Sequence, residues 1–167
     1  CTADALRASE ERLRLATEAA RMYAWEFDLR TGTPTFSADA ARVAGRAPSA
    51  SLAENLAAVH PDDRAHVADA LMAARRDGQG FDYEMRTTPD DGGTAWFRVV
   101  GTVLRDPDGA PARAVGIAQN VTDRKAIELA LRQSEERFRL AAEAVAAIIY
   151  DWDVTTGRVE RTRGLGE

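Results

Sequence analysis

The residues best suited to chemistry lie in one short stretch, His60-Pro61-Asp62-Asp63-Arg64, followed by His66. Histidine and paired carboxylates at such spacing could bind a metal ion or act as an acid–base pair. The same residues also fit the start of a helix, because proline is tolerated in the first turn and two acids complement the positive helix end. Helix-start chemistry accounts for them without a metal site. We predict a helix from here to about Arg76 that ends at Asp77-Gly78.

The remaining sequence carries none of the patterns that mark common catalytic centres. There is no P-loop, no catalytic triad, no CxxC pair and no cluster of metal-binding side chains. We therefore expect no catalytic residues and no metal site, and we look for a binding or signalling function instead.

Composition limits the class of protein further. The 167 residues are 45% hydrophobic, enough for one domain of about 100 residues with additional segments. No apolar run approaches the ~18 residues of a membrane span, and residues 1–20 are too charged for a signal peptide. The net charge of −5 argues against nucleic acid as a partner. The single cysteine fits a reducing, cytoplasmic compartment.

The first residue, Cys1, occupies the position where a native chain would carry methionine. We therefore expect the sequence to be a segment of a longer protein. That protein could carry a membrane anchor elsewhere, although we predict no membrane contact within this segment.

The stretch from Thr94 to Lys125 is expected to organise the fold of the rest of the chain. Its Val, Phe and Trp content predicts two long strands, and Pro107-Asp108-Gly109 supplies the turn between them. Thr122 is placed to cap a following helix, with Asp123 in its first turn. The last strand thus passes into a helix without a flexible spacer, which suits signal transmission. The predicted signal-coupling residues are Asn120, Val121, Thr122 and Asp123.

Several motifs in this stretch occur in order: W-F-R, then R-D-x-x-G, then V-G-I-A-Q-N-V-T-D-R-K. Together with H-P-D-D-R, they resemble the PAS family over about residues 22–125. The resemblance implies an α+β PAS fold: a five-stranded antiparallel sheet with short helices on one face. It also implies a sensory or signal-relay domain of a cytoplasmic bacterial protein, with a histidine kinase as the first expectation for the parent and a diguanylate cyclase as the next.

One position departs from the family pattern. The usual Asp-Ile-Thr motif reads Asn120-Val121-Thr122 here, so an amide replaces the acid. An amide can keep a hydrogen bond but not a charge-assisted one. From the motif alone, Asn120→Asp is expected to be tolerated or stabilising.

An internal repeat divides the chain. Ala5–Ala20 recurs as Ala130–Val145, and Trp25–Gly32 aligns with Tyr150–Gly157. We predict an incoming linker helix at 1–21, a PAS domain at 22–122, a signalling helix at 123–147, and the truncated start of a second PAS domain at 148–167.

Both helical copies carry apolar or small residues at alternating steps of four and three, the seam of a coiled coil. We expect a parallel homodimer through the linker helices; the alternative is that each helix packs on its own domain. The seam residues are Thr2, Leu6, Ser9, Leu13, Ala16 and Ala20 in the first copy, and Ile127, Leu131, Ser134, Phe138, Ala141 and Val145 in the second.

Alternation also predicts the pairing of the strands. Arg86 opposite Trp96, and Glu84 opposite Arg98, would give a cation–π pair and an opposite-charge pair. Extending the register puts Gly101 opposite Gly116 and Val99 opposite Ala118. The other face is aromatic, with small residues leaving room beneath the helices.

That face is the candidate ligand site, for a small apolar molecule held between sheet and helices. The equally weighted alternative is that its aromatic side chains only fill the core. The candidate residues are Trp25, Phe27, Phe81, Tyr83, Met85, Phe97, Val99, Gly101, Ala114, Gly116 and Ala118.

No cofactor is predicted, and haem and flavin stay open. Some PAS oxygen sensors hold iron through a histidine on the long helix, and His66 is the residue in that place. Photochemical flavin relatives use a cysteine on a helix, whereas the only cysteine here is Cys1. A third hypothesis, besides ligand sensing and cofactor sensing, is a ligand-free dimerisation and relay module.

Overall fold

The computed structural model describes residues 2–144 and 149–162. The chain forms two units, residues 1–122 and 123–167, and each is considered by itself. Among the described residues, no helix combines the length and the apolar character needed to cross a bilayer.

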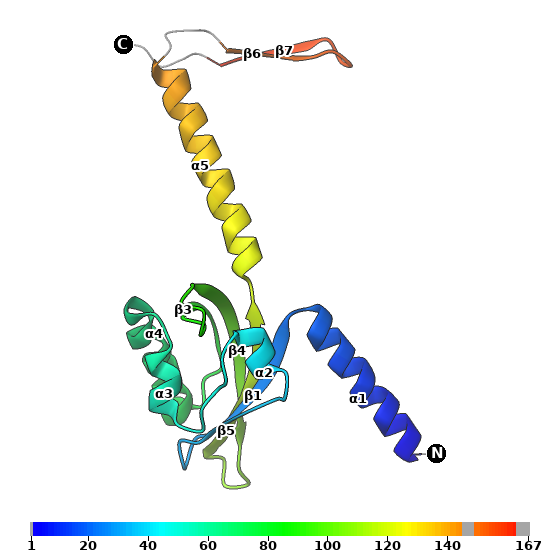
Figure 1. The fold of residues 1–167 in the computed structure, drawn as a ribbon, viewed down its shortest axis with the longest axis vertical. Helices are drawn as coiled ribbons and strands as arrows, with labels where there is room; N and C mark the ends of the chain where they lie inside the picture. The colour runs from blue at the N-terminus through cyan, green and yellow to red at the C-terminus, as the bar shows by residue number, and fades with distance from the viewer. Residues whose placement is uncertain (1, 145–148, 163–167) are drawn as a thin grey trace. The chain divides into compact units, whose positions relative to one another are not determined.

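The first unit is built on the predicted five-stranded antiparallel sheet, in the order β2-β1-β5-β4-β3 (Figure 1). The fold prediction, α+β with this sheet, is confirmed. The strands are β1 (Met22–Asp28), β2 (Pro34–Phe36), β3 (Phe81–Thr87), β4 (Ala95–Arg105) and β5 (Pro111–Asn120).

The predicted register is also confirmed. Gly101 pairs with Gly116 and Val99 with Ala118 between β4 and β5. Arg86 lies opposite Trp96, with its guanidinium carbon 5.5 Å from the ring centroid. A one-residue slip would have turned every side chain to the other face, so this register fixes which residues face inward.

On the charged face, Arg98 has Asp82 as a second acidic partner besides the predicted Glu84. Glu84 lies opposite Arg98, and the Arg98 guanidinium hydrogen-bonds the diagonal carboxylate of Asp82, at 2.9 and 2.5 Å. Diagonal neighbours across a strand pair are within reach of a long side chain such as arginine.

Three helices cover the inner face of the sheet: α2 (Ala40–Ala44), α3 (Leu52–Ala57) and α4 (Pro61–Asp77). The α4 helix begins with Pro61 and two acids in its first turn, and ends at Gly78, whose φ is 68°. This is the predicted helix. Beneath the helices, Phe97, Val99 and Ala118 form part of one buried cluster, and Phe27, Leu29 and Ala114 part of another.

The helices predicted as linkers are α1 (Thr2–Ala19) and α5 (Thr122–Ala144). After α5, strands β6 (Ile149–Asp153) and β7 (Arg158–Thr162) form a hairpin. Its pairs Tyr150↔Arg161 and Trp152↔Val159 correspond to Trp25↔Phe36 and Phe27↔Pro34 in the first unit. The sequence repeat thus extends to the strand register. The predicted 147/148 boundary and seam residue Val145 lie outside the described residues.

Candidate functional site

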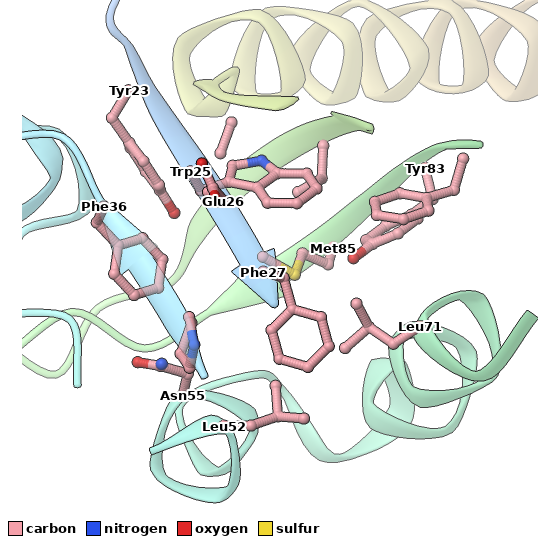
Figure 2. A pocket seen from close by; sticks show the side chains of 14 residues that line it. Tyr23, Trp25, Glu26, Phe27, Phe36, Leu52, Asn55, Leu71, Tyr83 and Met85 are labelled. Atoms are coloured by element: carbon pink, nitrogen blue, oxygen red, sulfur yellow. The ribbon is translucent and has the colours of Figure 1, made fainter. Parts of the chain in front are cut away.

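A cavity of about 110 Å³ lies between the inner face of the sheet and helices α3 and α4 (Figure 2). In the figure, Phe27 points from β1 toward Leu52 and Leu71, and Tyr23 lies beside Phe36. Strands β1 and β3 supply most of the aromatic wall. The predicted pocket residues that line this cavity are Trp25, Phe27, Phe81, Tyr83, Met85, Val99 and Ala118.

The other predicted pocket residues lie beneath or beside this cavity. The Trp25 indole covers Gly101 and Gly116: an added Cβ would lie 2.7 Å from its Cη2 at Gly101 and 2.6 Å from its Cζ2 at Gly116. Ala114 is fully buried, and Phe97 lines a neighbouring cavity. The space above the small residues is therefore taken by Trp25, which stacks on Phe81 with ring centroids 5.6 Å apart.

Sequence reasoning missed part of the wall. Tyr23 has the same strand parity as Trp25 and Phe27 and could have been included on alternation alone. The helix residues gave no comparable signal, because the inward faces of such short helices are set by tertiary packing. The missed lining residues are Tyr23, Glu26, Pro34, Phe36, Leu52, Asn55 and Leu71.

A second cavity, of about 140 Å³, adjoins the first. The α2 residues Ala40 and Ala44 form one wall, and Arg46 lines it from the loop that follows α2. The two cavities share Tyr23, Phe36, Leu52, Asn55, Leu71 and Met85 as lining residues. The two cavities are therefore adjacent.

The polar groups around the cavities are mostly donors. Burial raises the pKa of Tyr23 to about 12 and raises the pKa of Tyr83 as well, so both phenols are neutral at pH 7. Trp25 Nε1 and Thr87 Oγ1 are buried without a hydrogen-bond partner among the described residues. Asn55 is engaged elsewhere: its amide accepts from Ser49 N at 2.9 Å and donates to Ser49 O at 2.6 Å.

His66, the candidate haem ligand, lies outside both cavities. Its side chain is exposed on α4 and packs edge-on against Tyr83, with ring centroids 5.2 Å apart. Among residues 2–144 and 149–162, no group of acidic, histidine or cysteine side chains could hold a metal ion.

Asn120 connects the cavity wall to the start of α5. Its Oδ1 accepts from Thr122 N at 3.0 Å and from Thr122 Oγ1 at 2.7 Å. Because a backbone N–H can only donate, this contact fixes the amide orientation and directs Nδ2 to the carbonyl oxygen of Val43, 3.3 Å away in α2. One side chain thus joins α2 to the first N–H of α5.

The hydroxyl of Thr122, which was predicted to cap its own helix, also binds a neighbouring strand. This hydroxyl accepts a hydrogen bond from Trp96 N on β4 at 2.9 Å, while Trp96 O accepts from Val121 N at 2.8 Å. Thr122 therefore extends the β4–β5 ladder by one side-chain bond. Asn120 supplies a side-chain acceptor at the helix start, two residues earlier, as short amides commonly do.

A family model described as the PAS fold matches residues 35–118. The chain belongs to the PAS family. The matched region includes the helices and strands that enclose both cavities, apart from β1, and it ends just before Asn120.

Two curated relatives resemble this PAS domain and its flanking helices. The protein y4lL of Sinorhizobium fredii is 31% identical over 87% of this chain and 18% of its own length. The sensor protein FixL of Bradyrhizobium diazoefficiens is 30% identical over 84% of this chain and 29% of its own length. The chain thus spans less than a third of either relative.

A solved structure supports the same family assignment. The sensory box histidine kinase/response regulator of Burkholderia thailandensis is 34% identical, with a TM-score of 0.63, over 77% of this chain and 98% of the solved chain. The resemblance to a PAS sensor domain of histidine kinases, predicted from the motifs, is confirmed.

The acidic stretch that opens α4 has a structural role in this PAS domain. Asp63 accepts from Arg86 N at 2.7 Å and from two guanidinium nitrogens of Arg86 at 3.0 and 2.7 Å. These bonds lower the pKa of the Asp63 carboxyl below its usual range. The contact fastens α4 to β3 while Arg86 also covers Trp96, so the motif is explained without acid–base chemistry.

Proposed function

We propose that this PAS domain senses a small molecule with an apolar body in the paired cavities and passes the change to Asn120 and Thr122. The proposed setting is a bacterial signalling protein, in the cytoplasm, whose output is a histidine kinase. Because the chain spans only 18% and 29% of the two relatives, the activity of the whole protein is part of the proposal.

The observation that carries the proposal is the amide of Asn120. Helix α2 walls the second cavity through Ala40 and Ala44, and Val43 in the same helix accepts the Asn120 Nδ2 bond. A ligand that displaces α2 would therefore strain or release this bond. The same amide holds Thr122 N, so the displacement would reach the start of α5 in one step.

Two features favour a ligand over a core that is merely filled. The aromatic walls leave two adjoining spaces of about 110 and 140 Å³, close in size to an engineered cavity of about 150 Å³ that binds benzene. Buried polar atoms without partners usually call for an explanation, and a ligand is one. Trp25 Nε1 and Thr87 Oγ1 are such atoms.

Native mass spectrometry of the purified protein tests the proposal. We expect a retained small mass, or saturable binding of added aromatic compounds, that is lost in Leu52→Trp, because Leu52 lines both cavities. Leu104→Trp is the matched control, since Leu104 is exposed on β4 and lines neither cavity. If the protein retains no small molecule and binds none of the added compounds, a sensing role for these cavities is rejected.

The second candidate function is ligand-free dimerisation and relay. It is favoured by the exposed apolar seam of the linker helices, where Ile127, Leu131 and Phe138 are 70%, 58% and 65% exposed. The same mass spectra distinguish the two, because a dimer that neither retains nor takes up any compound would support relay.

A further inference from the structure

Arg46 places a cation at the wall of the second cavity. Its side chain is half-buried and lines the cavity from the loop after α2. Within the part of the chain that the structure describes, Arg46 forms neither an ion pair nor a side-chain hydrogen bond. A guanidinium has five N–H donors and no acceptor, so it suits an anion.

The loop that holds Arg46 is tied in place. Gly45 ends α2 in the left-handed region, with φ of 67°, and its carbonyl oxygen accepts from Asp90 N at 3.1 Å. A Cβ on Gly45 would lie 3.1 Å from Pro89 Cβ, so the two loops are in close contact. The backbone next to Arg46 is therefore positioned by its neighbours, which favours a defined binding position for the side chain.

A second donor lines the same cavity. Thr87 Oγ1 is buried and has no hydrogen-bond partner among the described residues. The Tyr23 phenol, which lines both cavities, also has no hydrogen bond within the described part of the protein. Hydroxyl groups can donate to an acceptor that enters from outside the chain.

The acidic side chain in the cavity walls is already paired with an arginine. Glu26 is the one acidic residue that lines either cavity within the described chain, and its carboxylate binds Arg113 Nη1 at 3.0 Å. The cavities therefore combine a large aromatic and aliphatic surface with one cation and several neutral donors. That combination matches a molecule with an apolar body and a single anionic acceptor group.

We propose that the paired cavities bind a small monocarboxylic acid whose apolar body is about one ring in size, with the carboxylate on Arg46. The body occupies the aromatic compartment beside Phe27 and Phe81, and the carboxylate lies in the compartment walled by α2. Arginine pairs with carboxylate through two parallel hydrogen bonds, which gives the site its orientation. This assignment rests on the proposed sensing function and narrows it to one class of ligand.

Phenylacetate and its neutral isostere phenylacetamide are the probes, measured by isothermal titration calorimetry on the whole chain. We expect phenylacetate to bind the parent protein more tightly, by about tenfold or more, as a charge-assisted hydrogen bond allows. Arg46→Gln should abolish this preference by weakening phenylacetate far more than phenylacetamide, and Arg46→Lys should restore part of it. Equal melting temperatures for the parent and both variants would show that folding is not the cause.

A further variant locates the site. Ala44→Leu adds volume to the α2 wall and leaves Arg46 in the sequence, so it should weaken the binding of both probes. If Arg46→Gln leaves the preference for phenylacetate intact, or if Ala44→Leu affects neither probe, the assignment is overturned.

The binding results for the two probes distinguish the carboxylate assignment from the sensing function on which it rests. Equal binding of the acid and the amide to the parent would overturn the carboxylate assignment and leave a neutral-ligand sensor standing. Absence of binding by either probe, and by hexanoate as an aliphatic acid, would overturn the assignment; together with no retained mass it would also end the sensing proposal.

Discussion

Asn120 is the residue at which this chain departs from the Asp-Ile-Thr motif, and its amide makes two kinds of bond at once. Oδ1 accepts from Thr122, and Nδ2 donates to Val43 O. A carboxylate could replace only the accepting part, because it has no donor when ionised. The Nδ2 bond therefore reverses the expectation, drawn from the motif, that an acid would be tolerated or stabilising here.

We expect Asn120→Asp to lower the free energy of unfolding by about 1–3 kcal/mol, because a carboxylate would face the Val43 carbonyl oxygen without a donor between them. Urea unfolding followed by circular dichroism measures the change. Asn120→Ala, which removes both roles, is the comparison. A variant Asn120→Asp at least as stable as the parent protein would mean that the Val43 bond contributes nothing.

The stability of the protein should depend on pH through the carboxyl group of Asp63. Its pKa is lowered in the folded state, chiefly by the side-chain hydrogen bonds from Arg86. A lowered folded-state pKa contributes stability above the unfolded value of about 3.9, and this stability is lost as the pH falls through the folded value. Asp63→Asn should therefore cost about 1–3 kcal/mol at pH 7, and the difference from the parent should shrink below about pH 4.

Chemical denaturation of both proteins between pH 7 and pH 3 measures that difference. Asp82→Asn is the control, because Asp82 also pairs with an arginine but both side chains are about half exposed, and exposed pairs contribute little. A gap between parent and Asp63→Asn that does not depend on pH would rule out the ionised carboxylate as the source of the stability.

At the scale of elements, alternation was the most informative signal. It placed Val99 opposite Ala118 and Gly101 opposite Gly116, and the structure has these pairs. The start and end of α4 were readable from Pro61 and Gly78 for a similar reason, since both follow local backbone preferences.

The sequence could not show how side chains divide the space beneath the helices. Gly101 and Gly116 suggested open volume, but the Trp25 indole fills it. Likewise, Thr122 fits a helix cap by type and position, and its hydroxyl also binds Trp96 N on another strand. Both outcomes depend on contacts between residues distant in the chain, which no local pattern encodes.

Gly116→Ala should destabilise the sheet by about 1–3 kcal/mol, because the new methyl group would overlap the Val100 carbonyl oxygen and lie 2.6 Å from Trp25 Cζ2. The larger Gly116→Leu should cost more and also close the cavity. Gly93→Ala is the control, since a Cβ there meets only the exposed Asp91 carboxylate at 3.2 Å. Equal melting temperatures for Gly116→Ala and the parent would place the Gly116 methyl position in open space.

At the scale of the whole molecule, the linker helices present apolar side chains that the described chain does not cover. We propose that the 4–3 seam pairs two copies. Leu131→Asp should then lower the mass measured by light scattering toward that of a monomer, because it buries a charge in the seam. Leu140→Asp is the control on the same helix, because Leu140 is exposed but lies off the seam. A similar loss of mass in both variants would assign the contact to general hydrophobic association.

The most direct test of the account is whether occupancy of the cavities reaches the start of α5. ¹H–¹⁵N NMR can follow phenylacetate or phenylacetamide as it is added, using the Trp25 indole N–H as the cavity reporter and the backbone amides of Trp96 and Thr122 as junction reporters. The account predicts saturable shifts at all three with one common Kd, and loss of the junction shifts in Asn120→Ala while the Trp25 shift persists. A Trp25 shift that leaves Trp96 and Thr122 unchanged in the parent protein would contradict it.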